Sequence, residues 1–492
     1  MEDIIEIKMD DLLDLEINLA KKEYEELQTK VLAKLLDKKP RDATELIAKY
    51  IEDEKHIKTT QSDNGSELWY YQDGIYKPNG KSIIEKLSRQ ILKEGYTTYL
   101  KNEIIGKVIA DTYIPNDEFF DQQNASPYII PVENGVLNLK TRKLTGFTPK
   151  KYFFNKINAI YEPGQDCPFW IKFVNEVVDG QDIVDTIQEW FGYCLVKNYK
   201  FEKSIMFHGA NGRNGKTKTI EVLQHLLGTS NYTNISLKTI ENKNDRFSLG
   251  ELRNKLLNVV ADISPEALNN EGRFKGLTGG DHFTVDQKFK EHFTFKNYAK
   301  MMFSGNELPV PSDTSDAFWS RWILVEFPYR FLPQKERDVY TPAEQIEKGI
   351  CLQNPDLLVD LTTSVELSGI LNWSLKGLTR LEKTKDFSYQ DTQNIVKKKW
   401  LLRSTNILAF IGEHLKEDYD SVIDKHLFKS AYVGWCKKNG VRPISDKRLF
   451  DVLTKDFAVQ SSRAMLNGEQ RRVWEGLKWI SQAPGANKII TK

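Results

Sequence analysis

The residues between positions 204 and 217 have the types and the order that phosphate chemistry requires. They read Ser-Ile-Met-Phe-His-Gly-Ala-Asn-Gly-Arg-Asn-Gly-Lys-Thr, an apolar run that enters a glycine-rich loop. Loop amides and a following helix N-terminus can face an anion, Lys216 can reach the β- and γ-phosphates, and the Thr217 hydroxyl can hold Mg²⁺. The segment predicts a site for ATP and Mg²⁺. We expect the nucleotide to be surrounded by Gly209, Ala210, Asn211, Gly212, Arg213, Asn214, Gly215, Lys216, Thr217 and Lys218.

The loop departs mildly from the strict phosphate-loop pattern. That pattern places a glycine five residues before Gly215, whereas Ala210 stands there and Gly209 lies one residue earlier. A turn rich in glycine and asparagine would explain the glycines, but it would not explain Gly-Lys-Thr at the start of a helix. The sequence therefore favours the phosphate interpretation.

Three residues farther along the chain are candidates for the chemistry of hydrolysis. Asp262 ends the apolar run Val-Val-Ala-Asp, where a carboxylate can hold the Mg²⁺ shell through water. Asn306 follows another apolar run and could orient the attacking water. Arg321 lies between aromatic residues at the start of a strand, from which a guanidinium could stabilise the γ-phosphate in a neighbouring subunit.

Each of these residues also has a structural interpretation. An acid can cap a strand end, an asparagine can occupy a turn, and an arginine can form a surface salt bridge. The catalytic base is not settled by the sequence, because Ile263 follows Asp262 and the nearest acid is Glu266.

Composition limits the class of protein. The 492 residues are enough for roughly three domains. Because 70 basic and 69 acidic residues nearly cancel, the net charge attracts no nucleic acid, and such contacts would need local basic patches. Four widely spaced cysteines disfavour a disulfide framework or a zinc ribbon. No apolar stretch approaches the about 20 residues that span a bilayer, and the acidic start is unlike a signal peptide. We expect a soluble, cytoplasmic protein with no membrane partner.

Apolar spacing and turn signals divide the chain into five parts. Aromatic strand-like pieces flank an Asp73-Gly74 turn, and several later apolar runs of buried type indicate a covered, largely parallel sheet. The fold class is α/β. We expect an α+β N-terminal domain at 1–158, a helical lead-in at 159–200, an ATPase core at 201–345, a helical extension at 346–402 and a C-terminal domain at 403–492.

The C-terminal part reads as a winged helix. An amphipathic helix at 425–439 and another helix at 445–455 precede two strand-like runs around Asn467-Gly468. Arg463, Arg471 and Arg472 flank that turn, so the wing could contact duplex phosphates, although winged helices also serve as protein contacts.

Taken in this order, the motifs resemble those of superfamily 3 helicases of the viral, phage and plasmid primase-helicase type, over about residues 65–480. The resemblance includes Lys-Gly-Leu-Thr-Gly-Gly-Asp at 275–281, Asn-Glu-Leu-Pro at 306–309 and Arg321. Upstream, Asn-Gly-Val-Leu-Asn-Leu at 134–139 and Cys-Pro-Phe-Trp at 167–170 are similar to the poxvirus-like domain that precedes the helicase core in this family.

The resemblance implies an AAA+-type P-loop fold that assembles as a hexameric ring, with ATP sites between subunits, and translocates on single-stranded and forked DNA inside a host or virus-infected cell. It also implies that the hairpin at 281–295 projects into the channel. Lys288, Phe289 and Lys290 form its tip, where cations grip phosphates and an aromatic ring meets a base; exposed lysines could equally serve solubility alone.

Residues 1–158 lack the acidic clusters and zinc-binding cysteines of a primase-polymerase domain, so a separate primase or polymerase is an expected partner.

Two other functions fit part of the sequence. One is an ATP-controlled initiator that assembles on duplex origin DNA without sustained unwinding. The other is a P-loop kinase for a small metabolite, which would need a lid and an acceptor site but neither an arginine donated in trans nor a basic hairpin.

Overall fold

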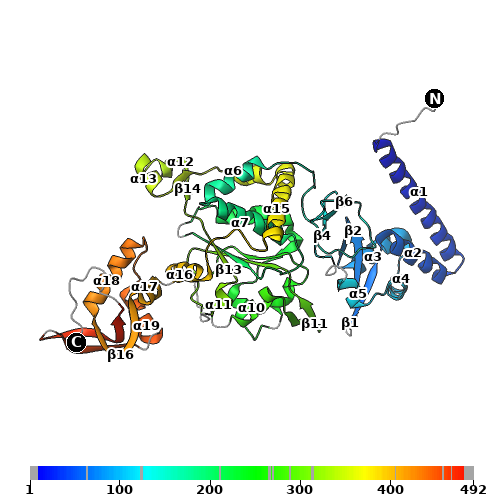
Figure 1. The fold of residues 1–492 in the computed structure, drawn as a ribbon. Coiled ribbons are helices and arrows are strands. Elements are labelled where there is room, and N and C mark those ends of the chain that lie inside the picture. The colour runs from blue at the N-terminus through cyan, green and yellow to red at the C-terminus, as the bar shows by residue number, and fades with distance from the viewer. Residues whose placement is uncertain are drawn as a thin grey trace.

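The computed structural model describes residues 9–62, 65–121, 126–209, 212–245, 247–263, 268, 271–287, 290–311, 315–404, 406–456, 459–466 and 468–480. Figure 1 shows them as an N-terminal unit, a larger central unit around a sheet, and a C-terminal unit that follows α16. Among these residues no helix combines the length and the apolar character that a membrane crossing would require.

Helices and two small antiparallel sheets form the N-terminal unit. Its helices are α1 (Met9–Leu36), α2 (Pro40–Lys55), α3 (Gly80–Leu92), α4 (Thr98–Asp111) and α5 (Asn116–Asp121), with a 3-10 turn at Lys93–Gly95. Its strands are β1 (Lys58–Ser62), β2 (Gly65–Gln72), β3 (Ile75–Lys77), β4 (Ile129–Val132), β5 (Gly135–Asn138) and β6 (Leu144–Thr145). The antiparallel pairing of β2 and β3 around Asp73-Gly74 confirms the predicted hairpin.

The two halves of this unit contribute to different hydrophobic cores. Side chains of α2, α3 and α4 form one core around Ile47, Ile84 and Ile104, all fully buried. In contrast, β4 and β5 contribute Ile130 and Leu137 to the core of the central unit. The second small sheet is therefore packed as part of the central unit, although it lies within the range 1–158.

A five-stranded parallel sheet forms the middle of the central unit and confirms the predicted sheet type. Its strand order is β13-β7-β12-β9-β8. Every residue of β7 and β12 is buried, as expected for strands covered on both faces. The bounds are β7 (Ser204–His208), β8 (Tyr232–Thr233), β9 (Leu257–Val260), β12 (Lys300–Gly305) and β13 (Trp322–Glu326).

The remaining elements of the central unit connect these strands or cover the sheet (Figure 1). The helices are α6 (Pro168–Val177), α7 (Gln181–Cys194), α8 (Lys216–Leu227), α9 (Leu237–Glu241), α10 (Gly272–Gly279), α11 (Asp316–Trp319), α12 (Gln334–Arg337), α13 (Pro342–Glu347), α14 (Leu357–Leu361), α15 (Ser364–Thr384) and α16 (Gln393–Ser404), with 3-10 turns at Thr229–Asn231 and Ser248–Leu252. The hairpin β10 (His282–Gln287) and β11 (Lys290–Lys296) is antiparallel, and the short pair β14 (Arg330–Leu332) and β15 (Ile350–Leu352) is parallel.

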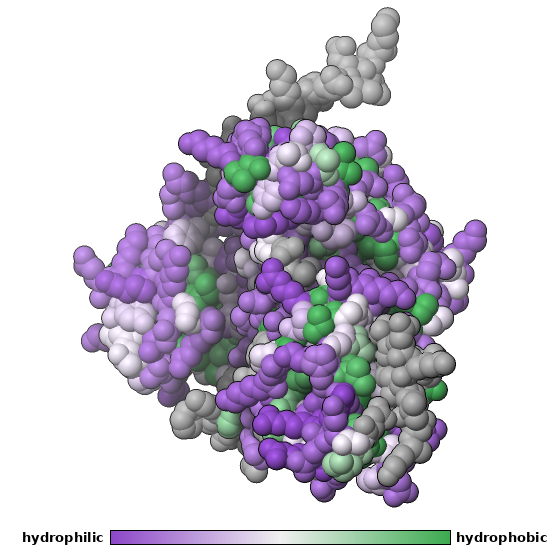
Figure 2. All heavy atoms as spheres, turned by 90° about the vertical axis from the view of Figure 1, so that its left-hand side faces the viewer, coloured by the Kyte–Doolittle hydropathy of each residue, from purple (hydrophilic) through white to green (hydrophobic). Residues whose placement is uncertain are grey.

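The C-terminal unit has its own core. It consists of α17 (Asn406–His414), α18 (Lys425–Lys438) and α19 (Asp446–Asp456) with the antiparallel sheet of β16 (Leu415–Asp424), β18 (Glu469–Trp479) and β17 (Gln460–Leu466). Phe410, Phe428 and Leu477 are fully buried within it. Figure 2 views the molecule from this side and shows a mainly hydrophilic surface on which hydrophobic residues form small, separate groups.

Helices α7 and α15 pack closely because α15 has a glycine where they cross. A Cβ at Gly377 would lie 2.4 Å from the backbone oxygen of Gln188. Next to this contact, the fully buried Glu189 accepts a hydrogen bond of 2.6 Å from Arg380 Nε. Since a buried carboxylate needs such partners, the crossing also fixes an internal ion pair.

We expect Gly377→Ala to destabilise the central unit by about 1–3 kcal/mol, because the added methyl group forces the helix backbones apart. Scanning calorimetry should show a lower transition temperature. Gly106→Ala is the matched control, since Gly106 lies inside α4 with no atom within 4 Å of an added Cβ. This control should be neutral or stabilising by about 0.5–1 kcal/mol. Equal shifts for the two variants would contradict the close packing of α7 on α15.

Candidate functional site: the carboxyl edge of the parallel sheet

The glycine-rich loop connects the end of β7 to the start of α8. Gly215, the residue before α8, has a φ of +93°, a conformation that L side chains rarely adopt. A Cβ there would also lie 2.5 Å from Val177 Cγ1 at the end of α6. Thr217 is exposed in the first turn of α8, at the helix N-terminus. The positive φ and the close approach of Val177 together explain why a glycine is found at 215.

Packing around the loop explains why a glycine is found at 209. A Cβ on Gly209 would lie 2.0 Å from Nδ2 of the buried Asn214. At the other side, the backbone oxygen of Arg213 accepts a hydrogen bond of 2.7 Å from the amide of Phe331, and the Arg213 guanidinium is 2.6 Å from Glu336. The loop is therefore fixed by β14 and α12. The predicted residues Ala210 and Asn211 lie outside the described residues, and Lys218 pairs with Glu221 at 2.7 Å.

Lys216 and Asn306 are brought together by the parallel strands. Asn306 follows the end of β12, next to β7, and its Oδ1 accepts a hydrogen bond of 2.9 Å from Lys216 Nζ. Lys216 Nζ also donates to Gly209 O at 3.1 Å. Burial lowers the pKa of Lys216 to about 8, and the negative charge of Asp262 opposes this shift. The Lys216 amine thus has two neutral oxygen partners. An anion bound at the loop would be a stronger partner for it.

Asp262 lies on the other side of Asn306. It follows β9, the neighbour of β12, and it is exposed. The amide of Ile263 donates to Ser304 O at 2.9 Å, which keeps this segment beside β12. Oxygen ligands such as those of Asp262 and Thr217 are the kind that Mg²⁺ prefers. The residues present therefore fit the predicted metal site.

A second group of polar side chains at the same edge was not foreseen from the sequence. His208 ends β7 and Glu326 ends the edge strand β13, which pairs with β7. The His208 Nε2 atom lies 3.2 Å from Asn306 O, and Nδ1 lies 3.9 Å from Glu326 Oε1. A sequence signal existed, because each is a polar residue at the end of an apolar strand.

Arg403 of α16 completes this group, and no local pattern in the sequence points to it. Its Nε and Nη2 atoms lie 3.0 Å and 2.8 Å from Glu326 Oε1. Burial lowers the pKa of His208 to about 4, with further lowering by Arg403 and Lys216 and an opposing effect of Glu326. Because His208 is neutral at ordinary pH and Asn306 O can only accept, Nε2 carries the proton and donates.

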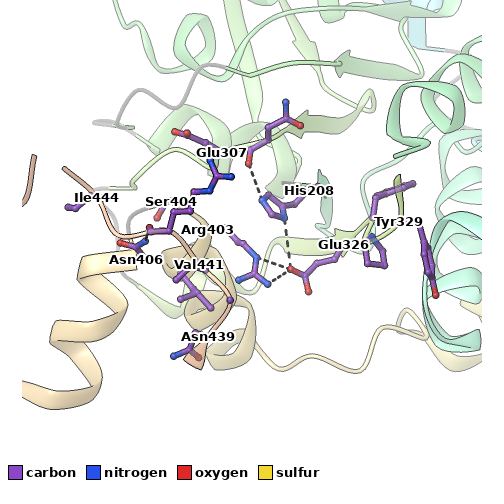
Figure 3. Close-up of a pocket in the computed structure, with 17 residues that line it drawn as sticks. His208, Glu307, Glu326, Tyr329, Arg403, Ser404, Asn406, Asn439, Val441 and Ile444 are labelled. Carbon is purple, nitrogen blue, oxygen red and sulfur yellow. Dashed lines mark hydrogen bonds and ion pairs between the residues drawn. The ribbon is translucent and has the colours of Figure 1, made fainter. Parts of the chain in front are cut away.

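These side chains line a cavity of about 680 Å³ between the central sheet and the C-terminal unit. Figure 3 shows Arg403 and Glu326 directed toward each other, with His208 next to Glu326. Gly209 and Asn306 of the central unit and Arg442 of the C-terminal unit also line it. The cavity thus adjoins the phosphate-binding loop.

Arg321 lies at the amino end of the parallel strands, opposite the end that carries the loop. It precedes β13, and its backbone oxygen accepts from the amide of Ser204, the first residue of β7. The loop follows the last residue of β7, so about 16 Å of strand separates the two. Within the chain, Arg321 donates to Thr278 Oγ1 at 3.0 Å and lies 3.4 Å from Glu202. Arg321 is therefore not brought to the loop of its own chain.

The predicted DNA-contact residues fall in two places. Lys288 and Phe289 lie outside the described residues, and Lys290 begins β11. On the C-terminal hairpin, Arg463 and Arg472 are exposed and face each other across β17 and β18. Arg471 points to the other face, where it pairs with Glu469 at 2.9 Å. Only two of the three arginines therefore share a face.

Two family models match separate parts of the chain. Residues 44–179 match the family described as D5 N terminal like. Residues 207–321, which include the loop, Asp262 and Asn306, match a family of unknown function, DUF5906.

Two curated viral proteins are similar to this chain. A putative helicase of Invertebrate iridescent virus 3 is 23% identical over 353 residues, which are 66% of this chain and 36% of that protein. A putative helicase of Acanthamoeba polyphaga mimivirus is 26% identical over 269 residues, which are 53% of this chain and 28% of that protein. The matched region is thus about a third of the length of these relatives.

Among solved structures, the A form of the apo NrS-1 C-terminal region aligns with a TM-score of 0.40 and 14% identity, covering 87% of this chain and 98% of that one. A second apo structure of the same region has a TM-score of 0.38 and 13% identity, with the same coverage. The D5 N terminal like match and the two viral relatives together support a relationship of this chain to D5-like primase-helicases.

Proposed function

We propose that this chain is an ATP-driven DNA helicase for the replication of a viral, phage or plasmid-type genome. The observation that carries the proposal is the position of Lys216 and Asn306, in contact at 2.9 Å at the carboxyl edge of a parallel sheet, directly beside the glycine-rich loop. Ligands of open α/β sheets bind at this edge. The relationship to putative viral helicases supports DNA as the second substrate.

Each residue at the edge has a role in ATP hydrolysis under this proposal. Lys216 neutralises the β- and γ-phosphates, and Thr217 and Asp262 hold Mg²⁺, which supplies charge stabilisation when bound. Asn306 orients the attacking water from its place between the loop and Asp262. The other loop residues from Gly209 to Lys218 present amides to the phosphates.

Arg321 completes the site from a second copy of the chain. Its distance from the loop of its own chain supports a role in trans, in an AAA+-type ring whose ATP sites lie between subunits. The hexamer is the assembly that we propose. In the single chain, its partners are Thr278, Ala317 and Glu202, so the plain salt bridge weighed above remains the competing explanation.

Two basic elements are proposed to hold DNA. The hairpin of β10 and β11 carries Lys288, Phe289 and Lys290 into the channel. The C-terminal unit acts as a winged helix whose exposed Arg463 and Arg472 contact phosphates. Like charges directly opposite each other in a sheet are unfavourable, so an anion between them would relieve the repulsion.

Lys216 makes the affinity for a triphosphate depend on pH. Its pKa of about 8 means that the free site loses its cation above that pH, whereas a bound triphosphate keeps the amine charged. Between pH 8 and 9.5, the Kd of a nonhydrolysable ATP analogue should rise by about tenfold per pH unit, the slope for one proton. In Lys216→Arg, whose guanidinium stays charged, the slope should vanish. A slope that persists in this variant would exclude Lys216 as its source.

The central experiment measures ATP turnover with and without single-stranded DNA, together with strand displacement from a fork. We expect stimulation and displacement in the wild type and no turnover in Lys216→Ala. The double variant Lys288→Ala, Lys290→Ala should keep much of the basal turnover but lose displacement. Lys21→Ala with Lys22→Ala, two exposed lysines of α1, is the matched control and should unwind normally.

The other outcomes separate the competing functions. Stimulation without displacement would favour the origin-binding initiator, and indifference to DNA would favour a metabolite kinase. Normal unwinding by the Lys288 and Lys290 double variant would show that the hairpin does not grip DNA.

Mixing subunits tests the role of Arg321. Arg321→Ala should reduce the turnover of wild-type protein by more than its share of the mixture, because each altered subunit also disables its neighbour's site. Glu202→Gln removes the partner of the ion pair but leaves the arginine, so it should not inhibit in mixtures. A loss strictly proportional to the fraction of Arg321→Ala would leave this arginine with a structural role only.

A further inference from the structure

A continuous series of polar contacts leads from the phosphate-binding loop to the C-terminal unit. Lys216 donates to the Asn306 side chain, and His208 donates to the Asn306 backbone oxygen. His208 faces Glu326, which Arg403 holds with two nitrogen contacts (Figure 3). The series crosses the ends of three adjacent strands, β12, β7 and β13, and ends on α16.

The backbone joins the same two regions a second time. The amide of Leu308 donates to Arg403 O at 3.4 Å, and the buried Trp400 Nε1 donates to Pro309 O at 2.7 Å. The segment that begins with Asn306 is therefore attached to α16 through its own main chain. The first helix of the C-terminal unit, α17, starts at Asn406, three residues after Arg403. The segment that begins with Asn306 is thus connected to the C-terminal unit through the end of α16.

We propose that Arg403 is a positioning residue that, through Glu326 and His208, holds Asn306 in place and couples nucleotide occupancy of the loop to the C-terminal unit. The inference rests on the proposed nucleotide site and adds to it a connection in which Glu326 and Arg403 lie outside both matched family regions.

The coupling follows from competition for Lys216. A γ-phosphate pairs with the Lys216 amine more strongly than a neutral amide oxygen does, so Asn306 Oδ1 loses this partner when nucleotide binds. His208 donates to the Asn306 backbone from Nε2, whereas a proton on Nδ1 would draw the ring toward Glu326, 3.9 Å away, and weaken this bond. Arg403 disfavours a proton on Nδ1, since it already binds and neutralises the Glu326 carboxylate.

The charged groups around His208 define how the connection responds to pH. Glu326 faces it from β13, Arg403 from α16 and Lys216 from α8, and Asn306 O faces it from the end of β12. Removal of Arg403 takes away a cation and leaves the Glu326 charge next to the imidazole. Both changes raise the pKa of His208 from about 4, so the acid limb of ATP turnover should move to higher pH.

The test compares full-length wild type, Arg403→Ala, the double variant Arg403→Ala, Glu326→Gln, and Lys397→Ala as a control on the same helix. Hydrogen exchange of residues 401–414 is measured by mass spectrometry with and without a saturating nonhydrolysable ATP analogue. Nucleotide should change the exchange of this segment in the wild type and in Lys397→Ala but not in Arg403→Ala. The analogue should bind to all four proteins.

Steady-state kinetics give a second readout that a merely structural role would not produce. Arg403→Ala should lower kcat about tenfold or more with little change in KM, because small displacements of a group that orients water reduce the rate by up to about 100-fold. Its acid limb should lie at higher pH than that of the wild type. The added Glu326→Gln change should return the acid limb toward the wild-type position, since it removes the charge that acts on His208.

Each outcome decides between the hypotheses. If Arg403→Ala retains the nucleotide-dependent exchange, or if its acid limb does not move, Arg403 does not couple the two regions. If the wild type binds and hydrolyses ATP but residues 401–414 do not respond, this inference fails and the proposed function stands. If the wild type binds no nucleotide, both fail.

Discussion

Parallel strands end at the same edge of a sheet, and the arrangement of this site depends on that constraint. The four strands β7, β9, β12 and β13 are each followed or ended by a polar residue, at His208, Asp262, Asn306 and Glu326. The apolar residues of these strands have little freedom, because the sheet is covered on both faces. A register shift in any strand would therefore move one of these polar groups relative to the loop.

Burial of Lys216 has a cost that its surroundings only partly offset. Lys216 is 6% exposed, its amine has two neutral oxygen partners, and its pKa falls to about 8. Desolvation of a charge without a counter-ion is unfavourable, so the site is more stable with an anion than without one. Under the proposed function, relief of this desolvation cost would supply part of the free energy of phosphate binding.

The sequence predicts the parts of the structure that depend on local patterns. The apolar runs identify the parallel strands, the Asp73-Gly74 turn identifies the hairpin of β2 and β3, and Gly-Lys-Thr identifies the start of α8. Contacts between distant segments leave no such pattern. The packing of β4 and β5 into the central core, the strand β16 and the contact of Arg403 with Glu326 arise from tertiary structure. The roles of individual site residues in catalysis stay predictions.

The separate hydrophobic cores of the described residues have a consequence for how the protein responds to mutation. One core lies among α2, α3 and α4, one surrounds the parallel sheet, and one belongs to the C-terminal helices and their sheet. Units with their own cores melt as individual cooperative blocks, so the whole chain need not follow a two-state equilibrium. A sequence change that weakens the C-terminal block can therefore accumulate without unfolding the sheet, which leaves that end of the molecule freer to diverge.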